Sequence, residues 1–318
     1  MSSIPSTTTN FCTSVEYQNL CQDIEAFNMD LIEKSQNDDM NKKREAIVEM
    51  IINNSVPEEL YQTSAKWSNM RTSVWSYVEK VLAHAGISAS REQIKCATKA
   101  GRGHNFDFSL TVIDIQGRRH DLKLELKFNA STISDAPQFV SPMKPSQYMG
   151  GSYEEFFYEN YLWQLTELAG ICLPEKSIYL KQVHGNKPVC IKEIQDKYYA
   201  GCKSSSKFTG DADDLAFYHK ANELSKESIA AFIGNNELNL IKLGEYLKVS
   251  QQGKYYMMFK NDEYHMETVD MDEYELVNVN AEPSKSRYIV TTKTGRELKV
   301  LLRWKNGNGI AYPAFQIS

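Results

Sequence analysis

The chain lacks the features that mark membrane, secreted and zinc-binding proteins. None of its apolar runs approaches the length of a membrane-spanning helix, so we expect no contact with a membrane. Residues 1–10 lack the basic and apolar parts of a signal peptide. The 6 cysteines show no paired short spacing, which favours reduced thiols over a zinc cluster or a disulfide framework. These absences predict an intracellular protein, cytoplasmic or, in a eukaryotic or viral host, nuclear.

The chain also lacks an overall excess of positive charge, because its formal net charge is −5. The charges are unevenly spread, however, and the last stretch carries seven basic residues against the single acidic residue Glu297: Lys285, Arg287, Lys293, Arg296, Lys299, Arg303 and Lys305. A segregated basic region is typical of proteins that bind a polyanion, although a solvated strand surface has the same composition. No phosphate-binding loop and no internal repeat is visible, which argues against a motor-coupled enzyme.

The stretch from Asn105 to Asn129 is the most informative part of the sequence. Apolar and polar residues alternate in two runs around Gln116 and Gly117, which predicts two antiparallel strands with one buried face. The polar face carries Asp107 on the first strand and a Glu-x-Lys triplet, residues 125–127, on the second. Two carboxylates and an ammonium group are the parts needed to hold a hard divalent cation beside a water molecule.

The length of the connecting loop decides whether these groups meet. A two-residue turn at Gln116 and Gly117 would leave Asp107 and Glu125 on different faces, because one step of register reverses every side chain. A three-residue loop from Ile115 to Gly117 sets the two carboxylates opposite one another, with Gly117 in the left-handed region that such loops favour. We therefore predict the three-residue loop or an equivalent bulge.

At these residues the chain resembles the PD-(D/E)xK nuclease superfamily, whose pattern is an Asp on one strand and Glu/Asp-x-Lys on the next. Here Asp107 precedes Glu125 and Lys127, and Asn105-Phe106 stands where the usual proline would be. The resemblance covers roughly residues 66–195. It implies an α/β fold with a restriction-endonuclease-like core, in which a central mixed sheet is flanked by helices.

The resemblance also suggests residues outside the hairpin. The family core begins with a helix, and residues 67–85 have helical spacing that ends at Gly86. Glu79 on this helix is a candidate metal ligand, because some members use a first-helix Glu. Several members place a Gln or Lys near the attacking water. Gln138 is the candidate here, since Pro137 suits a first helical turn whose N-terminus favours phosphate.

The activity that the resemblance implies is Mg²⁺-dependent hydrolysis of phosphodiester bonds in double-stranded DNA, with Mn²⁺ as a substitute. Asp107 and Glu125 would hold the metal ion and Lys127 would orient the water. The nearest functional class is a type II restriction endonuclease, which is commonly a homodimer. Two alternatives stay open: a structure-specific or nonspecific nuclease of repair or viral origin acting on DNA or RNA, and a nucleic-acid-binding protein whose carboxylates merely pair with lysines.

The rest of the chain predicts three regions: a helical region at 1–65, the nuclease core at 66–200, and a helix followed by antiparallel strands at 201–318. Residues 153–169 are expected to form a helix whose aromatic side chains lie in the core, and residues 177–183 a strand. The expected strands after Gly253 are 254–259, 264–269, 274–279, 287–292, 298–304 and 312–317. Candidate contacts to nucleic acid are Lys99, Arg102, Arg303, Lys305, Asn306 and Asn308.

Overall fold

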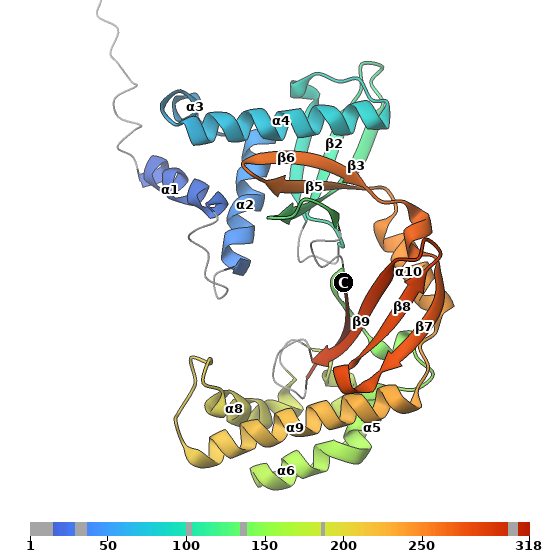
Figure 1. The fold of residues 1–318 in the computed structure, drawn as a ribbon. Helices are drawn as coiled ribbons and strands as arrows, with labels where there is room; N and C mark the ends of the chain where they lie inside the picture. The colour runs from blue at the N-terminus through green and yellow to red at the C-terminus, as the bar shows by residue number, and fades with distance from the viewer. Residues whose placement is uncertain (1–14, 29–36, 100–103, 134–138, 186–187, 305–310) are drawn as a thin grey trace, which may run out of the picture. The chain divides into compact units, whose positions relative to one another are not determined.

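The computed structural model describes residues 15–28, 37–99, 104–133, 139–185, 188–304 and 311–318. The chain has the expected mixed α/β fold, with two sheets and about half of its residues in helices. It divides into two compact units, shown in Figure 1. The first lies within Met1–Ala136 and Gln251–Val269, and the second within Pro137–Ser250 and Asp270–Ser318.

The sheet of the first unit has the strand order β1-β2-β3-β5-β6. Its strands are β1 (Ile94–Thr98), β2 (Phe108–Ile113), β3 (Arg119–Phe128), β5 (Lys254–Lys260) and β6 (Glu263–Thr268). Neighbours pair antiparallel except β3 and β5, which run parallel. The sheet is therefore mixed, and its last two strands come from a part of the chain more than a hundred residues beyond β3.

Helices cover one face of this sheet. They are α1 (Val15–Asp23), the short 3₁₀ segments η2 (Ile24–Phe27) and η5 (Arg91–Gln93), α2 (Asn37–Ile52), α3 (Glu58–Thr63) and α4 (Ala65–Ala85). Figure 1 shows α4 lying across the strands, and its buried residues share one core with those of α2, β2 and β3. The predicted helix is confirmed at its C-terminus, where Gly86 caps it at φ 66°, and it begins two residues before the predicted Trp67, where Ser64 accepts a hydrogen bond from the Trp67 N–H.

The β2–β3 hairpin has the predicted three-residue loop. Asp114 and Arg118 close it through a backbone hydrogen bond of 2.9 Å, and Gly117 adopts φ 79°. The Asp114 carboxylate stabilises the loop by accepting hydrogen bonds from the backbone N–H groups of Gln116 and Arg118. The resulting register pairs Phe108 with Leu124 and buries Phe108, Leu110 and Val112 on the helical side.

The sheet of the second unit is antiparallel, with the order β4-β10-β9-β8-β7. Its strands are β4 (Phe139–Met143), β7 (Leu276–Glu282), β8 (Arg287–Thr292), β9 (Glu297–Trp304) and β10 (Pro313–Ile317). The sequence predicted the last four of these strands to within a few residues. A period-two pattern with turn residues between the runs is a strong signal for antiparallel strands, because each strand has one buried face.

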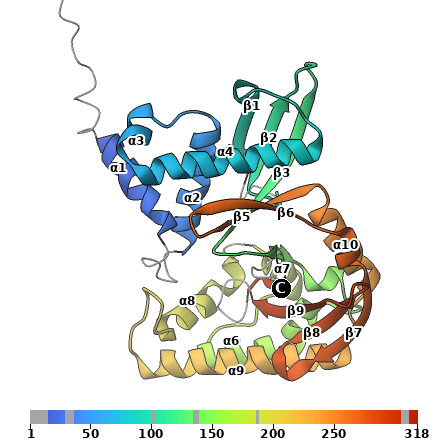
Figure 2. The same cartoon turned by 45° about the horizontal axis from the view of Figure 1, so that its top comes forward.

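The longer helices of the second unit are α5 (Tyr153–Phe157), α6 (Trp163–Ala169), α7 (Lys176–Gln182), α8 (Lys192–Gly201), α9 (Ala212–Asn235) and α10 (Leu240–Gln251). Figure 2 shows α8 beside α9. A π-helical turn at Tyr158–Leu162 joins α5 to α6, so the predicted helix at 153–169 is continuous. Its aromatic residues Tyr153 and Phe157 are fully buried and contact Trp304, as expected of core residues.

Several sequence predictions differ from the structure. Residues 176–182 form helix α7 and not a strand, because Tyr179 and Val183 are buried at helical spacing. Pro137, which was expected to begin a helical turn, lies outside the described residues, and the residues after Gln138 form strand β4. The predicted boundaries near 65 and 200 also differ from the observed units. The first unit takes its fourth and fifth strands from residues 254–268, and local periodicity does not show which sheet a strand joins.

The described helices include none that is both long enough and apolar enough to cross a membrane. Short 3₁₀ segments complete the second unit at Pro145–Gln147, Val189–Ile191, Met271–Tyr274 and Pro283–Lys285.

The hairpin loop gives a test of the register. Gly117 has open space around it, so Gly117→Ala should destabilise the protein through its positive φ alone, by about 1 kcal/mol. Gly150 also has open space and no positive φ, so Gly150→Ala should change stability by less than about 0.5 kcal/mol. Urea denaturation measures both. Equal effects of the two substitutions would contradict the left-handed assignment of Gly117.

Candidate active site

Asp107 lies where β2 leaves its ladder with β3. Its backbone N–H donates to the Leu124 carbonyl at 3.0 Å, and its carboxylate accepts a hydrogen bond of 2.7 Å from the Leu126 N–H. Asp107 is thereby fixed against β3 on either side of Glu125, through its backbone at Leu124 and through its carboxylate at Leu126. On the other side of Asp107, its carbonyl accepts the N–H of Lys99 at 2.7 Å, which places the backbone of that predicted contact residue at the site.

Glu125 lies on β3 with both carboxylate oxygens engaged. The ammonium group of Lys127 is 2.8 Å from Oε1, and that of Lys254 is 3.3 Å from Oε2. The Glu125 and Lys254 side chains are nearly buried, with 11 % and 2 % of their surface exposed. The predicted Asp, Glu and Lys side chains therefore converge, and a second lysine joins them.

Lys254 was missed by the sequence analysis because it belongs to a distant strand. The parallel register of β3 and β5 pairs Lys123 with Lys254 and Glu125 with Tyr256. In a parallel pair, residues in register share a face, so Lys254 lies diagonally across from Glu125. Its burial lowers the pKa of the ammonium group, and the attraction of Glu125 opposes that shift. The sequence does place Lys254 at the start of a predicted strand, at 254–259. It does not show that this strand pairs with β3, and so it could not place Lys254 beside Glu125.

Glu45 on α2 is a third carboxylate at the site. Burial, followed by the negative charges of Asp107 and Glu125, raises the pKa of Glu45 to about 7. Burial and then the charge of Glu125 raise the pKa of Asp107 to about 6, although the Leu126 N–H and the nearby lysines act in the opposite direction. Burial is the larger cause of both pKa shifts, and the neighbouring carboxylates add to it.

Two contacts of α2 place Glu45 there. The Arg44 guanidinium is fully buried and stacks 3.5 Å from the ring centre of Phe128, the last residue of β3, while its Nε donates to the Ala26 carbonyl at 2.7 Å. One turn later, Glu49 accepts the N–H of Thr98 at 3.3 Å, which ties α2 to the end of β1. Helix α2 is thus attached to the strands on both sides of the carboxylates.

The donor set suits a hard divalent cation. The described residues hold no group of three or more His, Cys, Asp or Glu side chains arranged to bind a metal ion unaided. Mg²⁺, however, is commonly bound by one or two carboxylates and several water molecules, so Asp107 and Glu125 provide enough protein ligands. Burial and the neighbouring carboxylates both disfavour ionisation of Glu45 and Asp107, and a bound cation would favour their charged forms. Carboxylates without cysteine favour Mg²⁺ or Mn²⁺ over Zn²⁺.

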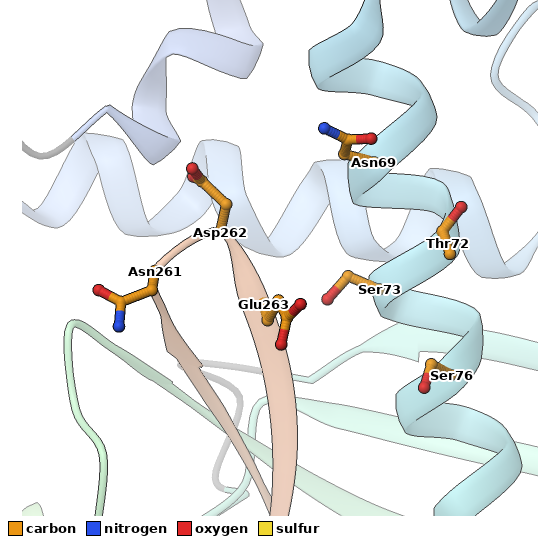
Figure 3. A pocket seen from close by; sticks show the side chains of 7 residues that line it. All are labelled: Asn69, Thr72, Ser73, Ser76, Asn261, Asp262 and Glu263. Atoms are coloured by element: carbon orange, nitrogen blue, oxygen red, sulfur yellow. The ribbon is translucent and has the colours of Figure 1, made fainter.

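Glu79, the predicted helical ligand, does not lie with these groups. Its exposed carboxylate pairs with Arg91 at 2.8 Å and lines a small pocket beside Trp75. A pocket of about 410 Å³ lies between polar residues of α4 and the turn that joins β5 to β6 (Figure 3). Asn69, Thr72, Ser73, Ser76, Asn261, Asp262 and Glu263 line this pocket. The helical carboxylate near Asp107 and Glu125 is Glu45 on α2, and Glu79 on α4 is not among these groups.

The remaining predicted residues fall into two groups. Arg303 is exposed on β9 of the second unit, where it donates to Gln316 Oε1 at 2.7 Å. Five others lie outside the described residues: Arg102, Gln138, Lys305, Asn306 and Asn308.

Comparisons of the chain with protein-family models, with curated proteins and with solved structures find no match.

The raised pKa of Glu45 predicts how stability depends on pH without metal. A carboxyl group whose pKa is higher in the folded state destabilises the fold as it ionises, so stability falls as pH rises from about 4.5 to about 7. Glu45→Gln should remove roughly 1–2 kcal/mol of this fall, a value discounted for partial exposure. Urea denaturation in EDTA at pH 5 and pH 8 measures it.

Glu79→Gln is the matched control, because Glu79 is exposed and pairs with Arg91, not with any residue of the carboxylate cluster. It should follow the wild-type pH profile. If Glu45→Gln also follows that profile, the close approach of Glu45 to Asp107 and Glu125 is refuted.

Proposed function

We propose that this protein is a Mg²⁺-dependent endonuclease that hydrolyses phosphodiester bonds in double-stranded DNA, in the manner of a type II restriction enzyme. The convergence of Asp107, Glu125 and Lys127 on neighbouring strands carries the proposal. The three-residue loop accounts for this convergence, since the pattern required that loop length for the carboxylates to meet. The mixed sheet, with helices on one face, is compatible with the resemblance noted in the sequence.

Each residue has a chemical role in this proposal. Asp107 and Glu125 would hold the metal ion, and the Leu126 N–H keeps the Asp107 carboxylate oriented toward β3. When bound, Mg²⁺ neutralises the charge of the phosphate and makes its water more acidic. Lys127, with 13 % of its side chain exposed, can turn from Glu125 toward the attacking water and the phosphate oxygens. Glu45, the third carboxylate near Asp107 and Glu125, is the candidate to take the proton of that water.

Partners and location are proposed on the same basis. Lys99 beside Asp107, and Arg303 on the second unit, are candidates for contacts to phosphate or bases. Enzymes of this class usually cleave the two DNA strands with two active sites, so we propose a homodimer in the cytoplasm, or in the nucleus of a eukaryotic or virus-infected cell.

One observation favours a second candidate function, a nucleic-acid-binding protein without catalysis. Lys127 and Lys254 together pair with both oxygens of Glu125, so a cation is not needed to neutralise that carboxylate. In this alternative the lysines are permanent partners of Glu125, and Asp107 serves only to hold β2 against β3. The two functions differ in whether DNA is cut.

Cleavage of supercoiled plasmid and of long natural DNA tests the proposal. Mg²⁺ should support cleavage and EDTA should abolish it. Asp107→Asn, Glu125→Gln and Lys127→Met should each slow cleavage by at least about 100-fold, since even indirect partners of a metal ligand contribute 10- to 100-fold. A discrete set of fragments indicates site-specific restriction, and a smear indicates a nonspecific nuclease.

Two controls accompany these variants. Glu79→Gln and Lys260→Met alter exposed residues away from the carboxylates and should leave cleavage unchanged. DNA that is bound but never cut, with either Mg²⁺ or Mn²⁺, would refute the nuclease proposal and establish the binding function.

A further inference from the structure

Lys254 introduces a constraint on how many metal ions the site can take. Its ammonium group lies 3.3 Å from Glu125 Oε2, while that of Lys127 lies 2.8 Å from Oε1. Each oxygen of the central carboxylate therefore faces a different cation. A metal ion that binds Glu125 must take the place of one lysine or share its oxygen with it.

The two lysines differ in their freedom to leave. Lys127 has 13 % of its side chain exposed, which is more than Lys254, and it lies near the end of β3, so its ammonium group has the shorter way to solvent. Lys254 has 2 % of its side chain exposed, and β5 is hydrogen-bonded between β3 and β6. Moving the Lys254 ammonium group away from Glu125 would leave a buried charge without its partner, which is strongly unfavourable.

Enzymes that use two metal ions place them about 3.5–4 Å apart, with ligands that contact both. Glu125 pairs with both lysines and influences the pKa of Asp107, so it is the carboxylate that two metal ions would have in common. Lys254 already lies beside one of those oxygens. Its ammonium group supplies there the positive charge that a second metal ion would supply.

Charge balance leads to the same result. When all are ionised and Lys127 has turned away, the carboxylates of Glu45, Asp107 and Glu125 and the ammonium group of Lys254 leave a net charge of −2. One divalent cation neutralises this charge. A second would bring the cluster to about +2 in a partly buried site, where repulsion between like charges is strong.

We propose that Lys254 stands in place of a second metal ion, so that each chain binds one divalent cation at this site. The inference rests on the proposed function, because it concerns the same metal site. In this arrangement Lys127 yields to the metal ion and Lys254 remains on Glu125. Lys254 is a positioning residue that holds Glu125 and limits the number of metal ions.

Counting bound Mn²⁺ tests the inference without any measurement of cleavage. Electron paramagnetic resonance and calorimetric titration at pH 8 should give one site per chain for the wild-type protein. Lys254→Met should expose a second, weaker site, because it removes a positive charge and frees an oxygen of Glu125. Lys254→Arg keeps the charge and should retain one site.

Lys260→Met is the matched control, since Lys260 lies on the same strand and face but is exposed and contacts Ser131 Oγ at 2.6 Å. It should bind one Mn²⁺. Circular dichroism establishes whether each variant is folded. If Lys254→Met does not fold, the wild-type count and Lys254→Arg still decide, because two Mn²⁺ ions in either protein overturn the inference.

The outcomes separate this inference from the proposed function. Two sites in the wild-type protein, or a single site in a folded Lys254→Met variant, would overturn the role of Lys254 and leave the nuclease proposal standing. The proposed function itself would be refuted if the wild-type protein bound no Mn²⁺, or if Asp107→Asn removed none of the Mn²⁺ that it binds.

Discussion

The parallel pairing of β3 with β5 is the contact on which the candidate site depends. It joins strands separated by more than a hundred residues and places Lys254 beside Glu125, where two buried ionisable groups satisfy each other. Without β5, Glu125 would be an edge residue of a three-stranded meander, open to water and without its second lysine. The same pairing adds β5 and β6 to the sheet that packs against α4. It therefore completes the core of the first unit as well as placing Lys254 at the site.

The carboxylates of the site repel one another when they are ionised, and a divalent cation would offset this repulsion. Three carboxylates approach one another, and the pKa values of two of them are raised because burial and like charges disfavour ionisation. The two lysines offset part of this repulsion at Glu125. Such partly compensated clusters are common at functional sites, where a protein maintains an unfavourable arrangement because ligand binding makes it favourable.

Helix α2 brings a carboxylate to this site that the sequence did not predict. Glu79, the residue that was expected to join the strand carboxylates, pairs with Arg91 at the surface, and Glu45 lies near Asp107 and Glu125. The difference arises from packing. Arg44 and Glu49 attach α2 to the ends of β3 and β1, next to Asp107, and the buried stripe of α4 leaves Glu79 on its exposed side. Periodicity identified both helices, but it could not show which one borders the site.

The sequence by itself determined the elements of local origin. Alternation specified the hairpin, the position of Gly117 specified its three-residue loop, and the spacing of apolar residues specified α4, because period, turn chemistry and capping act within a few residues of each other. Tertiary structure alone decided which sheet each strand joins, the division into two units, and the presence of Glu45 and Lys254 at the site. These features depend on contacts between segments that are distant in the sequence. Burial and charge pairing stabilise such contacts, but they produce no periodic pattern from which the contacts could be predicted.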